Sequence, residues 1–104
     1  ERSMRGWLVM AALAKLDPTE VAVCQRLADQ GDAKAQLTLG GMLGFGHGVA
    51  RDAIAGYVWL NLAAAQGNSD AAVLRDALVV EMTPDHVQKA QAQAAAWKPT
   101  TTSH

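Results

Sequence analysis

"ADQGDAKA", residues 28–35, returns as "AAQGNSDA" at residues 64–71, after a shift of 36 positions. Four residues recur identically, and Asp32 is matched by Asn68. A tight turn between two helices needs these residue types: small residues on both sides, a glycine that ends the first helix and a side chain that caps the second. A period in the thirties with two helices per unit is typical of a solenoid. The sequence therefore predicts an all-α fold, an α/α solenoid of stacked antiparallel helical hairpins.

Helix signals continue on both sides of the repeated stretch, whereas strand signals do not appear. Helices are expected to begin at capping residues and prolines, namely Asp17–Pro18, Asp32, Asp52, Ser69 and Thr83–Pro84. They are expected to end at Gly31, in the glycine-rich stretch after Met42, at Gly67 and at Pro99. The helix after Asp52 is apolar almost all the way round, so neighbouring helices should cover it on several sides. It is shorter than the roughly 20 apolar residues that cross a bilayer.

The stretch "GMLGFGHGVARD", residues 41–52, carries four glycines and raises the question of a phosphate-binding loop. A Walker loop needs a lysine and a hydroxyl residue after its last glycine, and a dinucleotide-binding fingerprint needs another glycine spacing between a strand and a helix. Neither condition is met. Gly46 and Gly48 instead predict a turn with positive φ. Val49 is expected to fill the apolar end of the hairpin, and Asp52 to cap the next helix.

Composition limits the class of protein. The chain has 104 residues, one domain's worth, and a formal net charge of −1, so it has no basic surplus for binding nucleic acid. Half of its residues are hydrophobic but only 5% are aromatic, which favours closely packed helices. Its one cysteine, Cys24, cannot form an internal disulfide and lies in an apolar stretch, so a buried structural thiol is expected.

The beginning of the sequence allows two interpretations. "MRGWLVMAALAK", residues 4–15, has an arginine, an apolar run and a small-x-small motif, as a signal peptide does, but it is short for one. We prefer an apolar helix within residues 1–16. Residues 1–3 precede the first methionine and could stem from a cloning vector. If this helix leaves an uncovered end of the stack, self-association or swapping of the helix is expected to bury it.

These residues together carry a resemblance to the Sel-one-like repeat family, a relative of the tetratricopeptide repeats. The residues that match its pattern are Ala28, Gly31, Ala35, Leu39, Gly40, Gly46, Gly48, Val49, Asp52, Trp59, Ala63, Ala64 and Gly67. Two positions depart from it: Leu43 replaces a usual tyrosine, and Gly56 replaces a usual alanine, so the unit could be slightly loosened. The resemblance spans residues 17–98 and implies a repeat domain closed by a C-terminal capping helix, followed by a frayed tail at residues 99–104.

Residues with catalytic or metal-binding chemistry are scattered. The three histidines lie far apart in the sequence, at His47, His86 and His104. Metal sites need closer ligand spacing, and no nucleophile has a base that spacing can identify. No catalytic residue, metal site or cofactor site is therefore predicted. Tyr57 and Trp59 lie in the most apolar helix and are expected in the core, whereas Trp7 or Trp97, near the ends of the stack, could contact a partner.

The expected function is a non-enzymatic interaction module that binds a protein or peptide. The resemblance implies a bacterial adaptor or scaffold in an envelope or signalling complex, in the cytoplasm or the periplasm. The residues expected to contact the partner alternate with buried positions on the second helix; they are Lys34, Gln36 and Thr38. The alternatives are a binder of a small molecule or cell-wall fragment and an accessory module of an envelope enzyme. Nucleic acid is not an expected partner, and no membrane span is expected.

Overall fold

The computed structural model describes residues 18–46 and 49–100, and α-helices make up 76% of them, without a β-strand in these ranges. The helices are α2 (Pro18–Asp29), α3 (Ala33–Phe45), α4 (Ala53–Ala65), α5 (Ser69–Val79) and α6 (Pro84–Ala96). The all-α prediction is confirmed. The apolar helix expected within residues 1–16 lies outside the described residues, as do Asp17, Gly48 and most of the expected tail.

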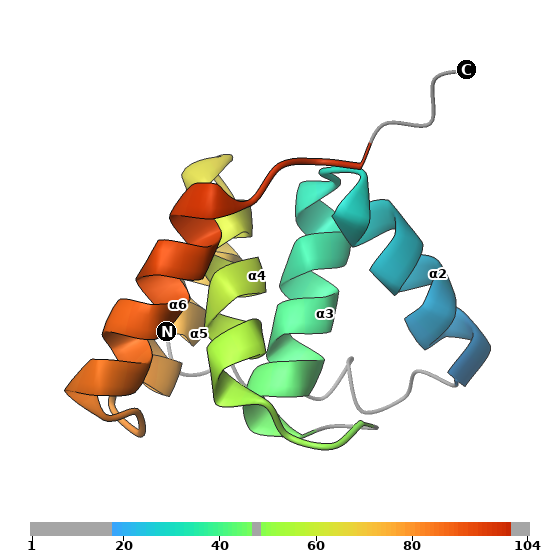
Figure 1. Cartoon of the computed structure of the whole chain (residues 1–104). Helices are drawn as coiled ribbons and strands as arrows, with labels where there is room; N and C mark the ends of the chain where they lie inside the picture. The colour runs from blue at the N-terminus through green and yellow to red at the C-terminus, as the bar shows by residue number, and fades with distance from the viewer. Residues whose placement is uncertain (1–17, 47–48, 101–104) are drawn as a thin grey trace.

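Helices that are neighbours in sequence pack against each other from α2 to α5 (Figure 1). Helices two apart also meet, because α3 contacts α5 and α4 contacts α6. Helix α4 therefore contacts α3, α5 and α6, as its nearly continuous apolar surface predicts. It is the central element of the described part of the chain.

The two copies of the repeated stretch form the same turn. Gly31 and Gly67 have φ values of 102° and 98°. In each turn the glycine N–H donates to the carbonyl three residues back, at 3.0 Å and 2.9 Å. The next N–H, of Asp32 or Asn68, donates to the carbonyl five residues back, at 3.0 Å and 3.1 Å. These two bonds define the Schellman motif, which satisfies the free carbonyls at a helix end.

Side-chain caps start four of the helices at or next to the predicted places. In each case the capping side chain accepts a hydrogen bond from the backbone N–H three residues later. The caps and their distances are Asp32 at 2.8 Å, Asp52 at 3.0 Å, Asn68 at 2.9 Å and Thr83 at 3.2 Å. For the helix expected to begin near Ser69, the capping residue is Asn68, one position earlier.

Helix α3 passes through Gly40 and Gly44 to Phe45 and ends within the glycine-rich stretch, as predicted. A Cβ on Gly40 would lie 2.8 Å from Leu60 Cγ, and one on Gly44 would lie 2.9 Å from Leu78 Cδ2. A Cβ on Gly56 would lie 2.5 Å from the backbone of Gly44. These glycines let helices approach closely, so Gly56 tightens the unit and does not loosen it, contrary to expectation.

The described residues that follow α3 form hydrogen bonds to the carbonyls at its end. Gly46 has a φ of 73°, as predicted, and its N–H donates to Met42 O at 2.8 Å. Asp52 N–H donates to Leu43 O at 2.8 Å, and Arg51 Nε donates to Gly44 O at 3.0 Å. Such bonds occupy carbonyls that the last turn of a helix leaves free.

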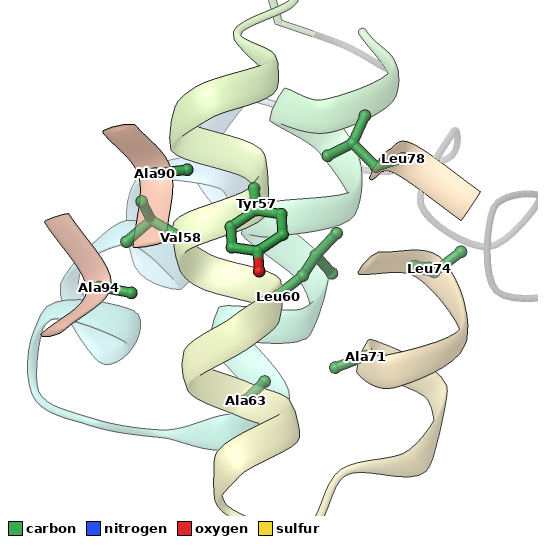
Figure 2. Close-up of a cluster of buried hydrophobic side chains, with 9 residues drawn as sticks. All are labelled: Tyr57, Val58, Leu60, Ala63, Ala71, Leu74, Leu78, Ala90 and Ala94. Atoms are coloured by element: carbon green, nitrogen blue, oxygen red, sulfur yellow. The ribbon is translucent and has the colours of Figure 1, made fainter. Parts of the chain in front are cut away.

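The larger apolar cluster lies around α4, between α5 and α6 (Figure 2). Its buried members are Tyr57, Val58, Leu60, Ala63, Ala71, Leu74, Leu78, Ala90 and Ala94. A smaller cluster of Ala28, Ala35 and Leu39 joins α2 to α3, with Trp59 packed against it. Tyr57 is in the core as predicted, whereas Trp59 is only half-buried.

Candidate functional site

The predicted partner-binding residues do not share one face of α3. Lys34 is exposed and Thr38 is half-buried, and the Thr38 hydroxyl donates to Lys34 O at 3.0 Å. Gln36 is fully buried, with 0% of its surface exposed, so its expected exposure is wrong. The reason is helical geometry, because residues four apart lie on one face whereas residues two apart point in nearly opposite directions. Alternation by two describes a strand.

Gln36 instead connects the two Schellman turns from inside the molecule. Its Nε2 donates to Ala28 O at 3.2 Å, and its Oε1 accepts from Gln66 Nε2 at 2.9 Å. Gln66 Nε2 also lies 2.9 Å from Gly31 O and donates to it. Gln66 belongs to the second turn and Gly31 to the first, so the hydrogen bonds hold the two turns together. A buried amide needs such partners, which explains the position of Gln36.

Lys34 and Thr38 line a groove between α2 and α3, which we term the α2–α3 groove. Its volume is about 410 Å³. The residues that line it are Cys24, Leu27, Asp32, Lys34, Ala35, Leu37 and Thr38. Apolar side chains therefore dominate the groove, with charged groups from Asp32 and Lys34. The Asp32 carboxylate is engaged as the cap of α3. The arrangement suits binding of an apolar surface more than a chemical reaction.

The apolar face of α2 is more exposed than the matching face of α4. The shift of 36 residues pairs Cys24 with Leu60 and Leu27 with Ala63. Leu60 and Ala63 are fully buried, whereas Leu27 is 38% exposed and Cys24 is half-buried. Val23, one turn before Leu27, is 39% exposed. The sequence predicted a buried thiol at Cys24 and made no prediction for Val23 or Leu27; the exposure of these side chains depends on what lies against α2, which a local apolar pattern does not specify.

The Cys24 thiol lies in the α2–α3 groove, where its surroundings disfavour the reactive thiolate. Partial burial raises the pKa of Cys24, and the carboxylates of Glu20 and Asp32 raise it further. A raised pKa keeps the thiol protonated near neutral pH, whereas the thiolate is the form that reacts as a nucleophile. The predicted buried thiol is confirmed only in part, since Cys24 is half-buried.

Metal-binding residues do not converge within residues 18–46 and 49–100, where no group of three or more His, Cys, Asp or Glu side chains could hold an ion. His86 is exposed at the start of α6. His47 and His104 lie outside the described residues.

A second hollow lies at the opposite end of α4 from the glycine turn, beside the end of α6. Its volume is about 430 Å³. The residues that line it are Gln30, Gly31, Leu62, Ala65, Gln66, Trp97 and Pro99. The Trp97 ring meets the Trp59 ring edge to face, with centroids 6.0 Å apart and planes at 76°. The sequence indicated Trp97 as a possible contact residue, but nothing in it pointed to Gln66 or Pro99 as neighbours.

Among the described helices, none is long and apolar enough to cross a membrane. In comparisons with known proteins, no family model, no curated protein and no solved structure matches the chain.

Proposed function

We propose that the chain is a helical-repeat interaction module of the Sel-one-like type, which binds an apolar helix of a protein partner in the α2–α3 groove. In this proposal the helices form an α/α solenoid of stacked hairpins, and α6 is its capping helix. Helix-in-groove binding uses an apolar face of one helix against an apolar groove of another protein.

Two observations support the solenoid. The first is the pair of Schellman turns, which occur 36 residues apart with the same bonds and the same kind of cap. The second is that α3 meets α5 and α4 meets α6, which is the contact pattern of stacked helical hairpins.

The observation that carries the binding proposal is the contrast between α2 and α4. Leu60 and Ala63 are fully buried in α4, yet the matching Cys24 and Leu27 of α2 are partly exposed. In a stack of repeats this face is the one that another helix covers. An exposed leucine beside an apolar groove is therefore a contact that a partner helix can complete.

The test uses the full chain as affinity bait in native lysate, read by quantitative mass spectrometry. The variants are Leu27→Glu and the double change Lys34→Glu with Thr38→Glu, and the matched control is Lys89→Glu on the exposed face of α6. We expect a near-stoichiometric protein that the unaltered chain and the control retain and that Leu27→Glu loses. With the purified partner, Leu27→Glu should weaken binding at least about tenfold, because a carboxylate then enters an apolar contact.

Equal capture by all variants would place the partner on another surface and contradict the proposal. Absence of a specific protein would instead favour the small-molecule alternative. That alternative predicts a rise in melting temperature when a ligand is added without a protein partner.

A further inference from the structure

Residues 97–100, which we term the strap, run from the end of α6 to the end of α2 (Figure 1). Trp97 has φ −69° and ψ 141°, values of the polyproline II conformation. Lys98 precedes a proline and is therefore restricted to extended or polyproline II geometry. Residues 99 and 100 were expected to be part of a frayed tail, but they are held in place.

Side-chain and main-chain contacts fix the strap at both ends. At one end, the Trp97 ring packs edge to face against Trp59 of α4. At the other, Thr100 N–H donates to Asp29 O at 2.6 Å. Asp29 is the last residue of α2, so its carbonyl has no partner inside the helix. Pro99 lies over the first Schellman turn, where a Cβ on Gly31 would be 3.8 Å from Pro99 Cβ, an ordinary contact distance.

The surface under the strap has the parts that peptide-binding grooves use for proline-containing ligands. Trp59 supplies an aromatic ring and Leu62 an apolar wall, while Asp29 supplies a main-chain acceptor. Domains that recognise polyproline II segments combine aromatic walls with hydrogen bonds to a ligand that is already extended and therefore loses little entropy on binding. We term this surface, formed by Trp59, Leu62, Gln66 and the turn at Gly31, the strap site.

We propose that the strap site is a binding site for an extended peptide with an aromatic residue two positions before a proline, and that the strap occupies this site as an internal competitor. The ligand places its aromatic ring against Trp59, its proline over the Gly31 turn and its next N–H on the Asp29 carbonyl. Binding requires the strap to leave. The strap site lies at the ends of α2 and α4, apart from the α2–α3 groove, so this proposal does not depend on the proposed function.

The test is carried out in the full chain with a peptide that repeats residues 95–101, Ala-Ala-Trp-Lys-Pro-Thr-Thr, carrying a fluorophore for anisotropy. The double variant Trp97→Ala with Pro99→Ala removes the ring that packs on Trp59 and the proline ring beside Gly31. The matched control is Lys98→Ala, because Lys98 is exposed. A second peptide with alanine in place of tryptophan reports the contribution of the ring.

We expect the double variant to bind the peptide at least about tenfold more tightly than the unaltered chain and Lys98→Ala do. The reason is that a tethered segment competes at an effective concentration on the order of millimolar. The peptide with alanine in place of tryptophan should bind to none of the three proteins. Equal binding by the three proteins, or no binding by a double variant that remains helical by circular dichroism, would overturn the proposal.

A second measurement covers the case in which the double variant does not fold. Hydrogen exchange of the Thr100 amide is followed by NMR in the unaltered chain while unlabelled peptide is added to several millimolar. A peptide that takes the strap site must release the Thr100–Asp29 bond, so the exchange rate of this amide should rise with peptide concentration. An unchanged Thr100 rate across the titration would show that the strap site does not accept the peptide.

Discussion

Gly56 lies where α4 passes α3, and a Cβ at this position would meet the Gly44 backbone at 2.5 Å. Backbone atoms of a packed helix cannot move aside as a flexible side chain can. Gly56→Ala should therefore lower the free energy of unfolding by about 1–3 kcal/mol, even though alanine is the better helix former by about 1 kcal/mol. Urea unfolding followed by circular dichroism measures this. A variant as stable as the unaltered chain would contradict the close approach.

Gln36 allows a prediction about a buried polar residue. Gln36→Ala removes the bond to Ala28 O and the bond from Gln66 Nε2, and it shortens a fully buried side chain. Each hydrogen bond contributes about 0.5–1.5 kcal/mol, so the loss of both should lower the unfolding free energy by roughly 1–3 kcal/mol. Gln25→Ala is the matched control, since Gln25 is exposed and donates to Asp29 Oδ1 in a surface hydrogen bond. Equal losses for the two variants would mean that Gln36 does not connect the turns.

The raised pKa of Cys24 predicts how alkylation and stability depend on pH. The folded chain holds the thiol protonated to a higher pH than the unfolded chain does, because burial and the nearby carboxylates disfavour the thiolate. This contribution to stability is therefore fully present below the unfolded pKa and is lost as pH rises through the folded pKa. Iodoacetamide should react more slowly with the native chain than with the chain in urea between about pH 8 and 9, where an ordinary thiol begins to ionise. Equal alkylation rates for the native and the unfolded chain would contradict a raised pKa of Cys24.

At the scale of helices and turns, the caps follow from sequence because their chemistry is local. Asp52→Ala should lower the unfolding free energy by about 0.5–2 kcal/mol, since the N–H of Ala55 loses its acceptor at the start of α4. Asp52→Ser should restore most of the loss because serine also caps well. Thermal unfolding measures the stability of both variants. A serine variant as unstable as the alanine variant would argue against a capping role of Asp52.

What the sequence did not predict depends on contacts between elements. The end of α3 in the glycine-rich stretch was predicted, but the close packing of Gly40 and Gly44 against Leu60 and Leu78 was not, because it depends on where α4 and α5 lie. The exposure of Gln36 was misjudged because alternation by two was applied to a helix. The starts of the helices and the central position of α4 were predictable. The α2–α3 groove was not predicted, although two of the three residues expected to contact a partner, Lys34 and Thr38, line it. Which apolar side chains line the α2–α3 groove depends on how α2 packs against α3.

For the whole molecule, the packing predicts an uneven distribution of stability. Among the described helices, α4 contacts three others, whereas α2 packs mainly on α3 and carries exposed Val23 and Leu27. Native-state hydrogen exchange should therefore show at least about 100-fold lower protection for amides within α2 than within α4, because local opening of α2 breaks fewer apolar contacts. Similar protection in both helices would indicate that α2 and α4 unfold in one step.

The two matching turns have a consequence for how such a gene can change. A tandem duplication of the DNA that encodes residues 32–67 would join Gly67 to a second copy of Asp32. That junction repeats the Gly31–Asp32 sequence, whose turn the molecule already forms. A duplication of this length therefore creates no new type of turn. Recombination can change the number of hairpins while every turn keeps a sequence that the molecule already uses.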